Sequence, residues 1–386
     1  MRTRSIVPIL VATGALASFA SLQAGEAPAS AKAVVPEKET SFYDDLWALT
    51  TLYSNKDNPF LQELKFTGRA HFDLYGVDAD QGDASDADVR RLRFGLKAKV
   101  LEDFTLHAEV DTNVEDPNPF YTRLTDAYLA WEPNKAFKLT IGKHGMPFTL
   151  DGRTSSNQLL TIDRSNLANN FWFPDEYLPG VSVSGVQDEW SYRVGVFSNG
   201  TANSEFGEFD ATWTALVGFG YDFKEALGAD KALVGFDYVY QDPTKQTTFT
   251  RAHEHVASVN LDYQEGRFGL GADMSASSGY GSQSDLFGFS LMPSYYLIDK
   301  KLQAVARYTF INSSDPKGIR LGRYEREVVS GRGDEYQELY AGLNYYLYGH
   351  KLKLQAGVQY TVMEDETNSG GDYDGLQGVV GLRMSW

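Results

Sequence analysis

Apolar and polar residues alternate with a period of two over the last ten residues of the chain, Gln377 to Trp386. One set is apolar and ends on an aromatic residue: Trp386, Met384, Leu382, Val380 and Gly378. Because a β-strand points successive side chains to opposite faces, this pattern predicts a strand with one apolar face. A terminal aromatic is typical of the closing strand of an outer-membrane β-barrel, although a soluble two-layer sheet alternates in the same way.

The same alternation recurs in many other segments of the chain. In residues 91–99, Arg91, Arg93, Lys97 and Lys99 stand between apolar residues, and residues 302–310 and 352–360 repeat the apolar alternation. We count sixteen such segments, starting near residues 64, 89, 103, 121, 136, 180, 189, 211, 231, 252, 266, 284, 301, 334, 350 and 374. A closed single-chain barrel of this type needs an even number of strands. The predicted fold class is therefore all-β, a transmembrane antiparallel β-barrel of 16 strands.

The connections between these segments alternate between short and long. The short ones are near 101–103, 133–135, 187–189, 264–266, 299–300 and 348–350, with 224–230 as a longer member. The long ones are 77–88, 112–120, 145–179, 199–210, 242–251, 277–283, 312–333 and 364–373. Short turns at one end and long loops at the other are typical of transmembrane barrels. The longest loop, after the fifth strand, is rich in aromatic residues, so we expect it to fold into the lumen as a constriction loop.

The N-terminus carries export signals. Arg2 and Arg4 precede an apolar run from Ile6 to Ala20, with small residues at the candidate cleavage positions. We predict a signal peptide over 1–24, a partly mobile periplasmic segment over 25–63 with a short helix near 42–49, and a barrel over 64–386. The chain has no cysteine, which suits an oxidising periplasm. The expected location is the bacterial outer membrane.

The net charge of the chain and the positions of its basic residues limit the functions that it can have. The formal net charge of −17 excludes nucleic acid as a partner, because no basic stripe exists to neutralise phosphates. A lysine or arginine on the lipid face costs about 2–4 kcal/mol at the midplane, so basic strand residues are assigned to the lumen. The nine predicted pore-lining residues of the anion pathway are Arg69, Arg90, Arg91, Arg93, Lys97, Arg153, Arg164, Arg193 and Arg307. The alternative is that these cations pair with the lumen acids Glu109, Asp111 and Asp126.

Catalytic and metal-binding motifs are weak. The six histidines lack metal spacing, and the pair His253 and His255 has no third ligand nearby. The outward strand positions are apolar, which leaves no place for a lipase-type Ser/His/acid set. Residues 78–83 miss the EF-hand spacing, leaving loose surface calcium binding open. We expect no enzyme activity, metal site or cofactor.

Short motifs between about residues 60 and 200 resemble the phosphate-selective porin O and P family. They are Gly68-Arg69, Asp73-Leu74-Tyr75, Val89-Arg90-Arg91, Leu101-Glu102-Asp103-Phe104, Thr125-Asp126-Ala127-Tyr128-Leu129, Ile141-Gly142-Lys143, Pro147-Phe148-Thr149-Leu150 and Thr154-Ser155-Ser156. The resemblance implies a sixteen-stranded homotrimeric barrel with basic residues along a narrow anion pathway. It places Arg69, Arg90 and Arg91 on matching basic positions and Arg153 near a basic position of the constriction loop.

One region departs from the family pattern. Strongly phosphate-selective members carry an arginine-dense fifth outer loop, whereas Gln241 to His255 offers only Lys245 and Arg251, with Glu254 beside them. The predicted function is a water-filled diffusion channel for small inorganic anions such as phosphate. A general or cation-preferring porin and a closed structural or adhesion barrel are the alternatives. Other expected partners are outer-membrane lipid and lipopolysaccharide, and the outer-membrane assembly machinery through the C-terminal strand ending in Trp386.

Overall fold

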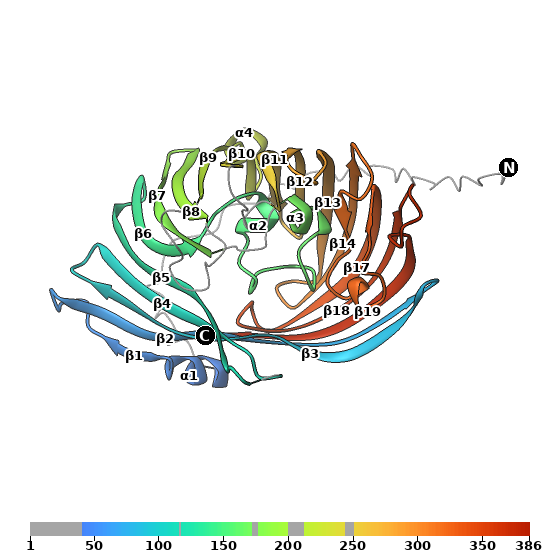
Figure 1. Cartoon of the computed structure of the whole chain (residues 1–386). Helices are drawn as coiled ribbons and strands as arrows, with labels where there is room; N and C mark the ends of the chain where they lie inside the picture. Colours follow the sequence, from blue (N-terminus) through green and yellow to red (C-terminus); the bar gives the residue numbers. More distant parts are fainter. Residues whose placement is uncertain (1–40, 116, 172–176, 200–211, 244–250) are drawn as a thin grey trace, which may run out of the picture. The chain divides into compact units, whose positions relative to one another are not determined.

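Sixteen antiparallel strands form the wall of the protein in a computed structural model, which describes residues 41–115, 117–171, 177–199, 212–243 and 251–386 (Figure 1). They are β2 Leu61–Ala79, β3 Gly82–Val100, β4 Phe104–Thr112, β5 Tyr121–Asn134, β6 Phe137–Gly145, β7 Tyr177–Gln187, β8 Trp190–Asn199, β9 Thr212–Asp222, β10 Lys231–Gln241, β11 His253–Glu265, β12 Phe268–Gly279, β13 Leu286–Ile298, β14 Leu302–Ser313, β17 Glu335–Tyr348, β18 Leu352–Glu364 and β19 Tyr373–Ser385. Each pairs with its neighbour along the chain, and β19 pairs with β2 from Gly375↔Ala79 to Ser385↔Arg69. The barrel is thus closed, and the predicted fold class is confirmed.

The closing strand β19 shows why the pattern of the sequence gives this wall. Val380 and Leu376 on its outer face are more than half exposed, at 55% and 53%. Val379 and Arg383 on the other face are buried, at 4% and 1% exposed. An outward apolar row and an inward polar row are what the two-residue period of a strand requires when lipid lies outside.

The predicted loop over residues 77–88 is wrong. β2 and β3 continue as one long hairpin, and only Asp80 and Gln81 join them. The many aspartates of this segment suggest a loop, but a strand needs only about 9–11 residues to cross the membrane. The 19 residues of β2 therefore extend beyond that length, into water, where acidic side chains are favourable on both faces.

The N-terminal described residues fold against the short-turn end of the barrel. The short helix predicted near 42–49 is present as α1, Phe42–Ala48, and is followed by β1, Thr51–Ser54, which pairs with β2 at Lys65 and Glu63. Trp47 Nε1 donates a hydrogen bond of 2.7 Å to the carbonyl oxygen of Ser385. The predicted signal peptide over 1–24, and the segment up to residue 40, lie outside the described residues.

Two long connections run inside the barrel. The first, residues 146–171, is named the inner loop and contains α2, Leu150–Arg153, and α3, Asn166–Phe171 (Figure 1). The second, residues 314–334, is named the second inner loop and contains β15, Ile319–Arg320, η1, Glu325–Glu327, and β16, Arg332–Gly333. A further short helix, α4, Lys224–Leu227, lies in a turn between β9 and β10. No helix within the described residues is long and apolar enough to cross a membrane.

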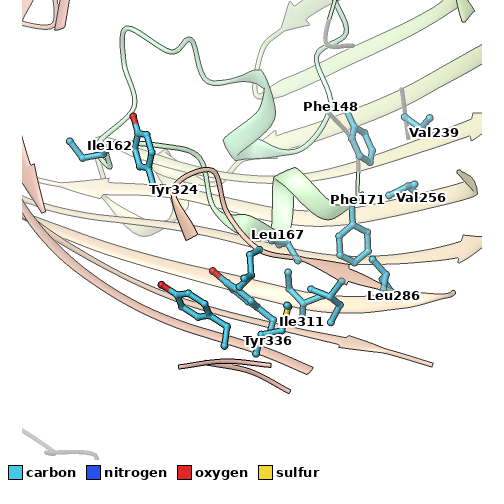
Figure 2. Packing of buried hydrophobic residues seen from close by; sticks show 14 of the residues in the cluster. Phe148, Ile162, Leu167, Phe171, Val239, Val256, Leu286, Ile311, Tyr324 and Tyr336 are labelled. Carbon is cyan, nitrogen blue, oxygen red and sulfur yellow. The ribbon is translucent and has the colours of Figure 1, made fainter. Parts of the chain in front are cut away.

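Apolar packing holds the inner loop against the barrel wall. Figure 2 shows Phe148 and Phe171 of this loop close to Val239, Val256 and Leu286 on the strands. Phe148 and Phe171 are both fully buried. Burying a side chain of this size contributes about 1.5–3 kcal/mol, so the aromatic residues keep the loop in the lumen. The part of the aromatic motif at Trp172 to Pro174 lies outside the described residues.

Candidate functional site

The inner loop is anchored at its start by a carboxylate on the facing wall. Asp273 of β12 accepts hydrogen bonds of 2.9 Å from the backbone N–H groups of both Leu150 and Asp151, at the beginning of α2. Within the loop, the Arg164 guanidinium donates to the backbone carbonyl oxygens of Asp151, at 3.1 Å, and Thr154, at 2.8 Å. The chain therefore turns tightly inside the lumen and presents its next residues toward the opposite strands.

Three inward cations hold the far end of the inner loop. Arg307 of β14 donates to the backbone carbonyl of Asp163 at 2.9 Å, and Lys353 of β18 donates to that of Leu159 at 2.6 Å. Arg383 of β19 donates to the carbonyl of Ile162 at 3.3 Å. All three side chains are buried. Backbone carbonyls of the loop thus replace water as the acceptors for these cations, and the loop is fixed across the barrel.

The second inner loop is tied to both the wall and the inner loop. The hydroxyl of Tyr324 lies 2.7 Å from Asp73 and 3.0 Å from Asp88, two carboxylates on β2 and β3. The Asn170 amide donates to the Arg320 carbonyl at 2.9 Å and accepts from the Arg320 backbone N–H at 2.8 Å. The two loops therefore form one layer inside the lumen. The sequence analysis treated residues 312–333 as an ordinary outer loop and missed this role.

An arginine-rich cavity of about 140 Å³ lies where these two loops meet β3. We name it the arginine vestibule; its lining residues are Arg90, Asp163, Arg164, Asn169, Arg251, Arg323 and Arg326. Among the described residues, five guanidinium groups and one carboxylate line this small volume, and Arg323 also pairs with Asp88 at 3.4 Å. Burial and then the positive charges of Arg320, Arg326 and Arg332 lower the pKa of Arg251 to about 9. The cluster therefore holds an excess of positive charge.

A β-bulge brings two adjacent arginines to this region. The register between β2 and β3 shifts between His71↔Arg91 and Asp73↔Asp88. Arg90 forms an ion pair with Asp163 of the inner loop at 3.2 Å, while its neighbour Arg91 is also buried, at 6% exposed. In a regular strand two consecutive side chains point to opposite faces, and an extra residue at a bulge re-aims one of them. Position alone could not decide where Arg90 points, and the bulge decides it.

Several of the predicted anion-pathway residues are ion-paired with lumen acids. The pairs are Arg69–Glu109 at 3.1 Å, Arg93–Asp111 at 3.2 Å, Arg153–Asp237 at 3.1 Å, Arg307–Glu338 at 2.6 Å and Arg193–Asp237. Glu109 and Asp111 are two of the acids that the pairing alternative names. The assignment of all nine basic residues to one open positive strip is therefore too simple. A cation taken out of water needs a partner, and the strand neighbours supply it.

Lys97 differs from these residues. It is exposed on the same face of β3 as Arg93, it lies opposite Lys65 and His107 in the register, and it makes no ion pair with any residue that the structure describes. Lys65 is paired with Glu63 at 2.9 Å, so the positive charge at this point of the short-turn end comes from Lys97. Lys97 therefore keeps the exposure that a pore-lining cation needs.

A larger cavity lies on the short-turn side of the inner loop. Its volume is about 570 Å³, and both Arg153 and Arg307 line it together with Asp151, Asp262 and Asp273. A cavity of about 20 Å³ lies between it and the vestibule; this small cavity shares Asp163, Arg164 and Arg323 with the vestibule and Arg307 with the larger chamber. That volume holds about one water molecule. The three cavities therefore adjoin one another within the layer formed by the two loops.

The residues that the sequence analysis missed are Arg323 and Arg326. They belong to a run of arginines at 320, 323, 326 and 332 in the second inner loop. The second inner loop therefore supplies two arginines to the vestibule, beside Arg251 from the region Gln241 to His255 that departs from the family pattern. The recurring arginines of residues 312–333 are visible in the sequence. They indicate a site in the lumen only if the loop enters the lumen, which their spacing does not show.

Comparison with known proteins assigns the chain to a family. The family model of the phosphate-selective porins O and P matches residues 64–266, more than half of the chain. The protein belongs to this porin family. No curated protein sequence matches this porin at a significant level.

Several solved structures share this fold at low sequence identity. The outer membrane channel DcaP of Acinetobacter baumannii has a TM-score of 0.58 and 15% identity, covering 87% of this porin and 100% of that chain. OprB of Pseudomonas putida has a TM-score of 0.59 and 13% identity, covering 84% and 94%. OmpT of Vibrio cholerae has a TM-score of 0.55 and 16% identity, covering 87% and 99%. The family and the fold together make this porin an outer-membrane channel.

Proposed function

We propose that this porin is a diffusion channel for small inorganic anions, with phosphate as the model solute. The arginine vestibule is the observation that carries the proposal, because its described lining holds five guanidinium groups and one carboxylate. No chemical bond is made or broken. An anion that enters from the long-loop side exchanges part of its hydration for charge-assisted hydrogen bonds to guanidinium groups.

The strength of this attraction must stay moderate for transport. Two unit charges about 4 Å apart interact by about 4 kcal/mol at an effective dielectric constant of 20. Several undiminished contacts of that kind would trap the anion. A net binding free energy of about −4 kcal/mol corresponds to millimolar affinity, from which an ion leaves quickly. The vestibule carboxylate and the acids that pair with Arg69, Arg93 and Arg153 reduce the field toward that range.

The proposed surroundings of the channel follow from the barrel wall. The apolar outer face contacts outer-membrane lipid, and the outer loops face lipopolysaccharide. Trp386 lies against Phe66 and Phe94, with ring centroids 5.9 and 6.2 Å apart, and we propose that this terminal strand is read by the assembly machinery. We also propose a homotrimer. OmpT of Vibrio cholerae, one protein of similar fold, is described in a trimer form, with a TM-score of 0.52 and 16% identity.

A closed barrel is the second candidate. The cavity of about 20 Å³ between the vestibule and the larger chamber is the observation that favours it, among the residues that the structure describes. In that case the layer of two loops would block ions, and the protein would act as a structural or adhesion barrel. A general or cation-preferring porin is favoured in turn by the formal net charge of −17.

Planar-bilayer recording separates these candidates. The purified mature protein is inserted into a lipid bilayer between solutions of different potassium chloride concentration. We expect single-channel steps whose reversal potential has the sign of a channel that prefers chloride over potassium. We also expect added phosphate to reduce the chloride current. The absence of steps would favour a closed barrel, and a reversal potential of the opposite sign would favour a cation-preferring porin.

A further inference from the structure

Asp163 is the one carboxylate among the described residues that line the arginine vestibule, while Asp88, which pairs with Arg323 at 3.4 Å, lies outside that lining. The Oδ1 atom of Asp163 lies 3.2 Å from Arg90 Nε, and the side chains of Asp163 and Arg90 are 23% and 17% exposed. The pair therefore faces the cavity and remains accessible from it. A carboxylate presents the same negatively charged oxygen atoms to a guanidinium group as a phosphate or sulfate ion does.

The backbone of Asp163 is fixed, whereas its side chain forms one ion pair, with Arg90, among the residues that the structure describes. Its carbonyl oxygen accepts hydrogen bonds from Arg307 Nη1 at 2.9 Å and from Thr161 Oγ1 at 2.7 Å. The preceding residue, Ile162, is held through its carbonyl by Arg383. The carboxylate can consequently leave Arg90 by a change of side-chain rotamer, with no movement of the inner loop.

The carboxylate stays ionised in this position. Burial by itself would raise the pKa of Asp163, but the charges of Arg90, Arg323, Arg91 and Arg383 outweigh that effect and hold it well below its usual range. A neutral acid would not compete for a cation, whereas this group carries its charge at every pH at which a porin works.

We infer that Asp163 is a tethered competitor for the anion site: its carboxylate occupies Arg90 while the vestibule is empty and is displaced when an anion enters. This inference rests on the proposed function and adds to it the residue that sets the affinity. A group tethered by one side chain has an effective concentration in the millimolar range or above. An inorganic anion must therefore reach a comparable concentration to displace it, and the returning carboxylate helps to release the anion. Without this competitor, the five arginines would bind a divalent oxyanion more tightly and pass it more slowly.

The test removes the carboxylate and measures phosphate binding. Chloride current through single channels is recorded while inorganic phosphate is added, and the half-blocking concentration is compared among variants. In Asp163→Asn and in the smaller Asp163→Ser, we expect this concentration to fall about tenfold, the factor that corresponds to about 1.4 kcal/mol. Asp163→Glu keeps the charge and should stay within about twofold of the unmodified porin, a difference of about 0.4 kcal/mol.

Asp315→Asn is the matched control. Asp315 is an exposed residue of the second inner loop outside the vestibule lining, and its change alters the net charge of the same loop layer by the same amount. An unchanged half-blocking concentration in both Asp163→Asn and Asp163→Ser would overturn the inference. An equal fall in Asp315→Asn would overturn it as well. Weaker phosphate block together with a larger chloride conductance would also overturn it, because Asp163 would then be an anchor of the inner loop. A porin without anion preference before any substitution would instead contradict the proposed function.

Discussion

Lys353 and Leu159 are 194 positions apart in the chain, yet the Lys353 ammonium group donates a hydrogen bond of 2.6 Å to the Leu159 carbonyl. Lys353 is fully buried on β18, and Gln355 of the same strand donates to the same carbonyl at 3.1 Å. Side chains of β18 therefore hold the middle of the inner loop. Arg307 and Arg383 act in the same way on neighbouring carbonyls.

Replacing this tether should loosen the inner loop. Lys353→Met keeps the length of the side chain and removes the ammonium group, at a cost of about 1.5–3 kcal/mol for a hydrogen bond from a charged donor. We expect a higher single-channel conductance with more current noise, and a smaller anion preference. Lys351→Met, an exposed lysine at the same turn, is the control and should leave both quantities unchanged. Equal conductance in the two variants would show that apolar packing alone holds the loop.

The arginines of the second inner loop should set the anion preference. We expect the double substitution Arg323→Gln and Arg326→Gln to move the chloride reversal potential toward zero. The half-blocking phosphate concentration should rise about tenfold, because each removed guanidinium weakens the local attraction. Lys317→Gln removes a charge from an exposed position in the same loop and serves as the control. If the control has the same effect as the double variant, anion selectivity depends on the net charge of the second inner loop and not on the arginines of the vestibule.

The ion pair between Arg307 and Glu338 should be required for stability. Its atoms are 2.6 Å apart, and both side chains are buried. Arg307→Met leaves Glu338 as an uncompensated buried charge and should lower the free energy of unfolding by about 3–5 kcal/mol. The double variant with Glu338→Leu should recover a large part of that loss. Urea unfolding in lipid vesicles, followed by tryptophan fluorescence, measures the free energy of unfolding of the single and the double variant. If the losses caused by the two substitutions simply add in the double variant, the two residues do not stabilise the fold as a pair.

Glu325 should make anion preference depend on pH. Burial first, and then the negative charge of Glu338, raise the pKa of Glu325 to about 7, from 4.5. Its carboxyl accepts hydrogen bonds from Gln359 and Thr361 of β18. Because the folded protein holds this proton more tightly than the unfolded chain, stability from this group is complete below about pH 4.5 and is lost as the pH rises through about 7. The loop layer should accordingly carry one more negative charge at pH 8 than at pH 6.

Reversal potentials at the two pH values test this expectation. The unmodified porin should prefer anions more strongly at pH 6 than at pH 8, and Glu325→Gln should show a smaller difference between the two. The same variant should be more stable than the unmodified porin at pH 8, by up to about 3 kcal/mol, and similar to it at pH 5. An identical pH dependence in both proteins would assign the effect to another titrating group.

Much of the barrel was predictable because its signal is local. The starts of most strands follow from the two-residue alternation, and fifteen of the sixteen predicted starts lie close to those of the structure; β9 starts at Thr212 against a predicted 211 and β18 at Leu352 against 350. The exception is the acidic hairpin of β2 and β3, where composition suggests a loop. Charge on that hairpin is compatible with a strand because its end projects into water.

The site was only partly predictable, because the position of a basic residue in the sequence does not show which acidic residue it pairs with. Arg193 and Arg153 come from different elements, and both pair with Asp237 of β10. Arg323 and Arg326 look like surface residues until their loop is seen to enter the lumen. Such contacts depend on which loops fold inward, and no periodic pattern records that.

By itself the sequence determined a closed sixteen-stranded outer-membrane barrel with an apolar outside and a polar lumen. Side-chain alternation and the cost of charge in lipid are properties of each strand and its solvent, so they can be read position by position. Only the tertiary structure decided that the lumen holds two loops, that most lumen arginines are neutralised by acids, and that Asp163 sits among arginines from four segments. The physical reason is that electrostatic pairing acts over a few ångströms between residues that are far apart in the chain.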